Sequence, residues 1–200
     1  MSQNQERRLT AVVRSVRPLH SGFLRVNHYE LEVERHEGGT RVTKWEVMER
    51  GNAVAVLGYD PTRDEVVLAN ELRPGMLAAG EYPFSDNLVA GAIEPDEDAL
   101  EAAKREMLEE LGLDLTEARL IHPGAYVSSG GTSEKIIIVV GLVDASSAGG
   151  VHGNPNENED ILTIVQSAER FIQRCMTGDI TDLKTLVAGY WLAQHRSTLR

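Results

Sequence analysis

Alternating apolar and polar residues dominate the N-terminal quarter of the chain. The alternation runs through three stretches, Ala11–Val16, Leu24–Glu34 and Thr40–Glu49, and a turn at Glu37-Gly38-Gly39 separates the last two. A period of two residues places successive side chains on opposite faces, as in a β-strand with one exposed face. Residues 10–50 are therefore predicted to form a meander of strands ahead of the main domain.

The remaining elements follow in an order typical of an α/β fold. Strands are predicted at Asn52–Tyr59, Glu65–Leu72, Ala118–Val127, Glu134–Val143 and Ile161–Val165, and helices at about 98–111, 167–176 and 181–195. Loops are predicted at 73–87, which holds two prolines and two glycines, and at Ala145–Asp160, which is rich in Ser, Gly, Asn and Glu. This order fits an α/β/α sandwich around a mixed sheet, with an N-terminal β-strand extension over 1–50 and the main domain over 51–200.

Composition and charge narrow the classes of partner. A chain of 200 residues that is 42% hydrophobic suits one globular domain with a small extension. Its net charge of −11 argues against polymeric nucleic acid and anionic membranes, although a local cation can still bring a small anion into a cleft. The single Cys175 and the N-terminus without an apolar core lead us to expect a soluble protein of the reducing cytoplasm.

The predicted helix at 98–111 concentrates acidic residues on one side. Leu100, Ala103, Met107 and Leu111 form its apolar stripe, and Glu106, Glu109 and Glu110 converge on the other face. The repulsion between these carboxylates is relieved either by solvent, as on an ordinary acidic surface helix, or by a cation. Carboxylate oxygens are the hard ligands that suit Mg²⁺.

The same stretch resembles the Nudix box, a motif with two glycines and a set of charged residues at fixed spacing. The matching positions are Gly91, Glu97, Arg105, Glu106, Met107, Glu109, Glu110, Gly112 and Leu113. Other segments are similar to the ADP-ribose pyrophosphatase branch of Nudix hydrolases, namely ERGNAVAVL (49–57), NELRPG (70–75), VAGAIE (89–94), SGGTSEK (129–135), GLVDAS (141–146) and GNPNENEDI (153–161).

The resemblance implies a reaction, a cofactor and a partner. It implies hydrolysis of ADP-ribose to AMP and ribose 5-phosphate with Mg²⁺, for which Mn²⁺ substitutes, in a homodimer whose N-terminal strands swap and complete each other's adenosine pocket. Two departures, Ser129 where the branch has proline and Asn87 where it has an acid, favour the alternative of a GDP-mannose or other nucleoside-diphosphate-sugar hydrolase. A non-catalytic nucleotide sensor is the third reading, but such a protein is expected to lose box carboxylates, and this chain keeps them.

Roles for individual residues follow from the motif and the resemblance. Glu106, Glu109 and Glu110 are the expected metal ligands, and the resemblance adds the carbonyl of Ala90. Glu97 and Arg105 are expected to pair and to shape the junction before the helix rather than to catalyse, with Gly91 and Gly112 as structural glycines. The resemblance places the general base in the loop at Glu157, with Glu134 as a second candidate and Glu159 as a substitute if the register slips.

Substrate contacts are assigned to three residues. Arg73, at a strand end, is the expected diphosphate clamp because arginine binds phosphate oxygens bidentately, although a surface arginine remains the alternative. Trp45 resembles the tryptophan that stacks on adenine in some members, and a core or dimer-interface tryptophan is the alternative. Arg50, within the ERGNAVAVL segment, is assigned to the substrate pocket with them.

Overall fold

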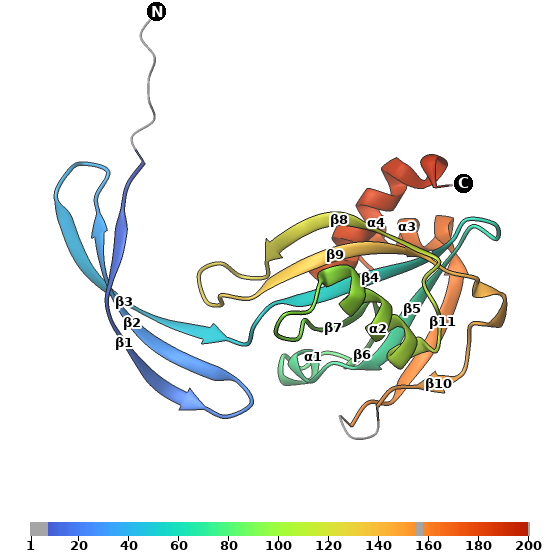
Figure 1. The fold of residues 1–200 in the computed structure, drawn as a ribbon, viewed down its shortest axis with the longest axis horizontal. Coiled ribbons are helices and arrows are strands. Elements are labelled where there is room, and N and C mark those ends of the chain that lie inside the picture. Colours follow the sequence, from blue (N-terminus) through green and yellow to red (C-terminus); the bar gives the residue numbers. More distant parts are fainter. Residues whose placement is uncertain (1–7, 155–157, 200) are drawn as a thin grey trace, which may run out of the picture. The chain divides into compact units, whose positions relative to one another are not determined.

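The computed structural model describes residues 8–154 and 158–199 (Figure 1). These residues form two compact units. One comprises the described residues up to Gly51 together with Tyr126–Glu134, and the other comprises Asn52–Ala125 and the chain from Lys135 onward. The N-terminal unit therefore contains a segment from the middle of the chain that the expected division at residue 50 had left in the main domain.

The N-terminal unit is built on three antiparallel strands, as the alternation predicted. They are β1 (Ala11–Ser21), β2 (Arg25–Glu34) and β3 (Thr40–Glu49), in the order β1-β2-β3. The segment Tyr126–Glu134 joins this unit because Met48 of β3 forms a parallel bridge with Thr132. The Met48 amide donates to the Gly131 carbonyl at 2.9 Å, and the Met48 carbonyl accepts from the Ser133 amide at 3.1 Å.

A larger mixed sheet carries the rest of the fold. Its eight strands within the described ranges are β4 (Ala53–Asp60), β5 (Glu65–Leu72), β6 (Phe84–Asn87), β7 (Val89–Ala92), β8 (Glu117–Tyr126), β9 (Lys135–Leu142), β10 (Val151–His152) and β11 (Ile161–Ser167). The main order is β10-β11-β5-β4-β9-β8, with β6 beside β5 and β7 beside β4. The β4–β9 pair is parallel, whereas β4 pairs antiparallel with β5 and β7.

Helices cover both faces of this sheet. They are α1 (Pro74–Ala78), α2 (Ala99–Leu111), α3 (Ala168–Thr177) and α4 (Leu183–His195), with short 3₁₀ turns η1 (Ala145–Ser147) and η3 (Arg196–Thr198). Polar N-caps begin the three long helices, because the side chains of Asp98, Ser167 and Asp182 accept hydrogen bonds from backbone amides of the first turn. In the described part of the chain, no helix is long and apolar enough to cross a membrane.

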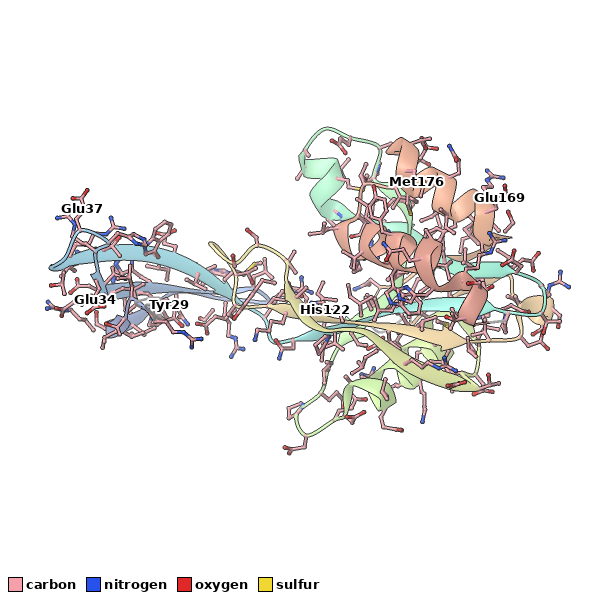
Figure 2. The ribbon with its side chains drawn as sticks, turned by 90° about the horizontal axis from the view of Figure 1, so that it is seen from above. Tyr29, Glu34, Glu37, His122, Glu169 and Met176 are labelled. Atoms are coloured by element: carbon pink, nitrogen blue, oxygen red, sulfur yellow. The ribbon has the colours of Figure 1, made fainter. Side chains whose placement is uncertain are left out.

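Alternation along β4 produces two hydrophobic cores. Val54 and Val56 pack with α2, whereas Leu57 and Tyr59 pack with α3 and α4. Every residue of β4 after Ala53 is buried, as expected for a strand covered on both faces. Figure 2 shows α2 on one side of the strands and the C-terminal helices on the other. The predicted α/β/α sandwich around a mixed sheet is confirmed.

One cysteine lies between the C-terminal helices. Cys175 of α3 is buried, and a Cβ atom added at Gly189 of α4 would overlap its sulfur. The two helices therefore approach closely at this point because position 189 has no side chain. Burial raises the pKa of the Cys175 thiol to about 11.

The predicted loops at 73–87 and 145–160 were wrong in part. The first contains α1 and β6, and the second contains η1 and β10. The sequence analysis also missed strand β7. It pairs with β4 over four residues, from Val89 opposite Val56 to Ala92 opposite Ala53. These elements have two to five residues, too few to show a hydrophobic period, and proline at the first position of α1 is compatible with a helix start.

Candidate active site

Helix α2 is held at a fixed rotation by its caps and its apolar stripe. Asp98 accepts from the Leu100 amide at 2.8 Å, and Gly112 ends the helix with a left-handed φ of 66°. Met107 and Leu111 are buried in the core beneath the helix. This rotation buries Glu106 and Glu110 as well, whereas the Glu109 side chain is half exposed. The expected triad of carboxylates is therefore divided between two buried acids and one exposed acid.

Glu110 is the least compensated of the buried acids. Its side chain is 3% exposed, and its Oε2 atom has no hydrogen-bond partner. Burial raises the pKa of its carboxyl to about 9, with further contributions from the charges of Glu71, Glu106 and Glu159, while Arg73 opposes the rise. An ionised carboxylate in this position is costly unless a cation approaches it.

Glu106 lies against the backbone of β7. Burial raises the pKa of its carboxyl, and Arg105 opposes this shift. A Cβ atom added at Gly91 would overlap the Glu106 carboxylate. Gly91 is therefore required for close approach, since any side chain at this position would displace the acid. Ala90, the expected carbonyl ligand, precedes it on β7 and pairs with Ala55.

Arg105 ties the start of α2 to the preceding loop. Its Nε and Nη2 atoms each donate to Glu97 at 2.9 Å, and Nη2 also donates to the Ala92 carbonyl at 3.0 Å. The Nη1 atom donates to Glu106 at 2.7 Å and to Glu109 at 3.4 Å. The hydrogen bonds from Arg105 are the main cause that lowers the pKa of Glu97 to about 2. The structure thus contains the ion pair that the motif suggested.

Glu71 and Arg73 extend the site from the end of β5. The Arg73 Nη2 atom lies 2.6 Å from Glu71 Oε1. Burial raises the pKa of the Glu71 carboxyl, while the charge of Arg73 lowers it and that of Glu159 raises it. Sequence reasoning selected Arg73 but missed Glu71. The period of β5 was the available signal, because Val67 and Ala69 face the α2 core and residue 71 follows on the same side.

The loop before β11 contributes Glu159. Its Oε2 atom accepts from the Asn154 amide at 2.9 Å, and its charge raises the pKa values of Glu71, Glu106 and Glu110 after the larger effect of their burial. We call these four acids the carboxylate cluster. Glu157, the first candidate for the general base, lies outside the described residues.

Three expected site residues belong to the N-terminal unit. Glu134 is buried, and its Oε1 atom lies 3.5 Å from Arg50 Nε. The Glu134 amide donates to Thr132 Oγ1 at 3.1 Å, which fixes the backbone at this point. Trp45 lies on β3 opposite Tyr29 and is half exposed. Glu134 and Arg50 thus form one ion pair, and Trp45 presents an indole surface for contact.

The carboxylate cluster fits a hard divalent cation in its donor chemistry. Within residues 8–154 and 158–199, no three His, Cys, Asp or Glu side chains are already arranged as a metal shell. The unpartnered Glu110 oxygen and the raised pKa values nevertheless describe oxygen donors that a cation would stabilise. Glu106 and Glu109 meanwhile form ion pairs with Arg105, which also pairs with Glu97.

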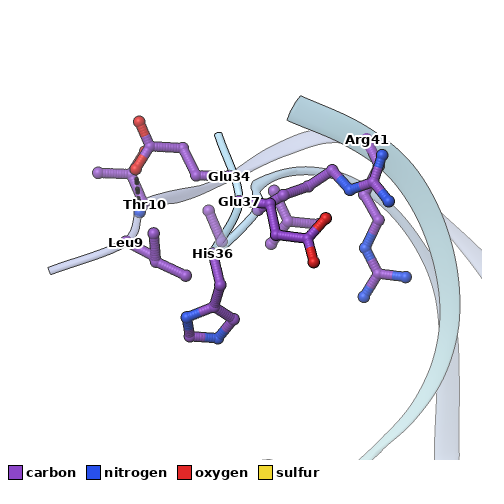
Figure 3. Close-up of a pocket in the computed structure, with 9 residues that line it drawn as sticks. Leu9, Thr10, Glu34, His36, Glu37 and Arg41 are labelled. Atoms are coloured by element: carbon purple, nitrogen blue, oxygen red, sulfur yellow. Dashed lines mark hydrogen bonds between the residues drawn. The ribbon is translucent and has the colours of Figure 1, made fainter. Parts of the chain in front are cut away.

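A hollow of about 530 Å³ in the N-terminal unit lacks this chemistry (Figure 3). It lies between the start of β1 and the β2–β3 turn and is lined by Leu9, Thr10, Ala11, Val33, Glu34, Arg35, His36, Glu37 and Arg41. None of the residues that the sequence assigned to catalysis, metal or substrate lines it. The chemistry expected from the sequence is therefore found at the buried carboxylates and not at this hollow, and the carboxylates remain the candidate site.

Comparison with known proteins adds related sequences across nearly the whole chain. ADP-ribose pyrophosphatase of Escherichia coli K12 is 37% identical over 183 residues, covering 91% of this chain and 87% of that protein. The enzyme of the same name from Haemophilus influenzae is 32% identical over 91% of this chain and 85% of its own length. GDP-mannose pyrophosphatase of Salmonella typhimurium is 28% identical over 88% of this chain and 92% of its own length.

A solved structure and a family profile complete the comparison. The structure described as an ADP compounds hydrolase superposes with a TM-score of 0.71 at 18% identity and covers 94% of this chain and 95% of its own, which supports the fold. The profile of the NUDIX domain matches residues 49–173, a span that contains α2 and the carboxylate cluster. The chain therefore belongs to the NUDIX domain family.

Proposed function

We propose that this protein hydrolyses the pyrophosphate bond of ADP-ribose to give AMP and ribose 5-phosphate, with Mg²⁺ as its cofactor and Mn²⁺ as a substitute. The observation that supports this proposal most directly is the buried Glu110 carboxylate. One of its oxygens has no partner, and the charges of three other acids and of Arg73 act on it. A diphosphate that arrives with a divalent cation supplies the positive charge that this arrangement lacks.

Residues of α2 and β5 divide the binding tasks. Glu106, Glu109 and Glu110, with the Ala90 carbonyl, hold the cation, which when bound neutralises phosphate oxygens and lowers the pKa of a water. Arg73 donates hydrogen bonds to the diphosphate. The Glu97–Arg105 pair keeps the loop before α2 in place, so that Gly91 stays against Glu106.

The general base is proposed to be Glu157, with Glu134 as the alternative. A base that closes on the substrate from a loop affects kcat and leaves the Mg²⁺ requirement unchanged, whereas loss of a metal-binding acid raises that requirement. We expect Glu157→Gln to lower kcat at constant Mg²⁺ affinity and Glu134→Gln to raise the Mg²⁺ concentration for half activity. A Mg²⁺ titration of both variants measures this, and near-normal kcat in Glu157→Gln would exclude that residue and leave Glu134 or Glu159.

The N-terminal strands are proposed to form a homodimer and to supply Trp45 and Arg50 to the adenosine pocket. The support is the apolar surface that this unit leaves exposed, at Val12, Val13, Val16, Leu19, Phe23 and Val42 among others. Swapping these strands between subunits of a cytoplasmic enzyme would cover that surface. Sedimentation at micromolar concentration tests the assembly, and a monomeric wild-type protein would contradict it.

Substrate choice is tested by a panel of nucleoside-diphosphate sugars. The products carry phosphomonoesters and the intact substrate does not, so a coupled phosphatase releases inorganic phosphate only after cleavage. We expect the highest kcat/KM for ADP-ribose. A higher value for GDP-mannose would favour the second candidate, which is supported by the relatives of that name and by Asn87, whose Nδ2 atom donates to the Ser85 carbonyl at 2.9 Å. Tight binding without cleavage would instead indicate a sensor.

A further inference from the structure

Glu71 is a shielded acid that neither the Nudix box nor the proposed metal ligands include. It lies near the end of β5, where Val67 and Ala69 precede it on the same face and are fully buried against the α2 core. Its side chain is 19% exposed, and its charge acts on Glu110. An acid in this position adds negative charge where a diphosphate has to bind, which by itself disfavours binding. Glu71 is therefore expected to contribute to substrate binding in another way.

That role is suggested by the single contact of the Arg73 side chain. The Arg73 backbone is fixed, because its amide donates to the Pro83 carbonyl at 2.7 Å and its carbonyl accepts from the Met76 amide at 3.0 Å. The guanidinium, by contrast, forms an ion pair with Glu71 through Nη2 at 2.6 Å, a contact that lacks hydrogen-bond geometry, and it makes no hydrogen bond within the described residues. Nε and Nη1 thus keep their donors available.

We propose that Glu71 is a positioning residue, which holds the Arg73 guanidinium by one nitrogen and leaves the other two to receive the diphosphate of the substrate. The inference rests on the proposed function, since Arg73 is the diphosphate clamp in that scheme. An arginine has many side-chain rotamers, and a charge-assisted contact to one nitrogen removes that freedom before the substrate arrives. The pair also keeps the arginine beside Glu110 when no cation is bound, which explains why an acid is useful here.

The test compares two Arg–Glu pairs whose glutamates lie on one strand, β5, and whose arginines lie just beyond its two ends. Glu71→Gln keeps the shape of the side chain but removes its charge. The matched control is Glu65→Gln at the other end of β5, where Arg63 Nε lies 2.6 Å from Glu65 Oε2 with the same separation of two residues. We expect Glu71→Gln to raise KM about tenfold, with kcat within about twofold of wild type and a Mg²⁺ requirement that changes less than KM does. Glu65→Gln should change none of these values.

A double-mutant cycle shows whether Glu71 acts through Arg73. In an Arg73→Ala background, Glu71→Gln should have no further effect on KM, because the guanidinium that it positions is gone. An unchanged KM in the single variant, an additive effect in the cycle, or a shift confined to the Mg²⁺ requirement would each overturn the proposal. Thermal unfolding of each variant identifies any loss of fold, which a positioning role does not produce.

Equilibrium binding separates this inference from the proposed reaction. An α,β-methylene analogue of ADP-ribose cannot be cleaved at the diphosphate, so calorimetry with Mg²⁺ reports binding without turnover. A Kd about tenfold weaker in Glu71→Gln than in wild type supports positioning even if the wild-type protein proves unable to hydrolyse the natural substrate. Equal Kd values overturn the role of Glu71 while leaving hydrolysis intact, and absence of binding by wild type overturns both.

Discussion

Two glutamates of the Nudix motif, Glu97 before α2 and Glu110 within it, have opposite surroundings. Glu97 accepts two hydrogen bonds from Arg105 and one from the Glu94 amide, and its pKa falls to about 2, mainly through Arg105. Glu110 is buried among other acids with one oxygen unpartnered, and its pKa rises to about 9, mainly through burial. The same side chain therefore favours the folded state at one position and opposes it at the other.

This contrast distinguishes acids that stabilise the structure of the site from acids that are proposed to bind the cation. Evolution can satisfy a structural acid completely, because nothing has to displace its partners. A ligand acid must remain incompletely satisfied, since a cation has to gain free energy by approaching it. Activity at such a position is expected to cost stability in the metal-free protein.

The largest effect is expected for Glu110→Gln. Loss of a carboxylate from the proposed metal site should lower kcat by about a thousandfold or more, because cation stabilisation supplies several kcal/mol at the phosphorus. The amide can donate to neighbouring carboxylates, so the metal-free variant should unfold about 3 °C or more above wild type at neutral pH. Steady-state kinetics and calorimetric melting with a chelator measure the two effects.

Retention of more than about a tenth of kcat at saturating Mg²⁺ would show that Glu110 is no metal ligand. A lower melting temperature in the metal-free variant would instead remove the proposed contrast, since the carboxylate would then contribute to folding.

A smaller effect on activity and a larger effect on stability are expected for Arg105→Ala. The change removes the hydrogen bonds that Arg105 donates to Glu97, Glu106 and the Ala92 carbonyl, and it leaves Glu97 with the Glu94 amide alone. We therefore expect a melting temperature about 5 °C lower and a kcat about tenfold lower. Lys104→Ala is the control, because its pair with Glu101 is solvent-exposed. A kcat loss as large as that of Glu110→Gln, without a change in melting temperature, would make Arg105 catalytic.

The smallest effect is a pH dependence assigned to Glu97. The folded pKa is about 2, below the 4.5 of an unperturbed glutamate, so the unfolded chain binds the proton more tightly. This contribution to stability is present above pH 4.5 and is lost as the pH falls through about 2. The free energy of unfolding of the wild type should therefore exceed that of Glu97→Gln above pH 4.5, and this difference should disappear as the pH falls to about 2. A constant difference in unfolding free energy between the two proteins would refute the assignment.

The sequence predicted the parts of the site that depend on local pattern. The limits of α2, the stop at Gly112 and the partners Glu97 and Arg105 all lie within one continuous motif, where spacing determines which side chains meet. The pattern could not decide how far α2 rotates into the core. For that reason it grouped Glu109 with Glu110, although one is half exposed and the other buried.

The other parts of the site and fold depend on pairing between strands that are distant in sequence, which the sequence pattern does not reveal. Glu71 joins the cluster because β5 lies next to strands distant in sequence, and its role became visible only with the Arg73 contact. The pairing of Asn70 with Asp86 and of Leu72 with Phe84 turns part of a presumed loop into β6, without any repeating pattern in its four residues. Such short strands are stabilised by their neighbours rather than by their own composition.

Cys175 is enclosed between α3 and α4 beside Gly189, and its reaction with a thiol reagent can therefore report when these helices separate. A thiol that is buried and protonated at neutral pH does not react with a disulfide dye until the helices separate. The chain has one cysteine, so each molecule releases one equivalent of chromophore when it opens. The rate of labelling of the unmodified wild type would therefore follow opening of the C-terminal helices, with no introduced probe and no assumption about catalysis.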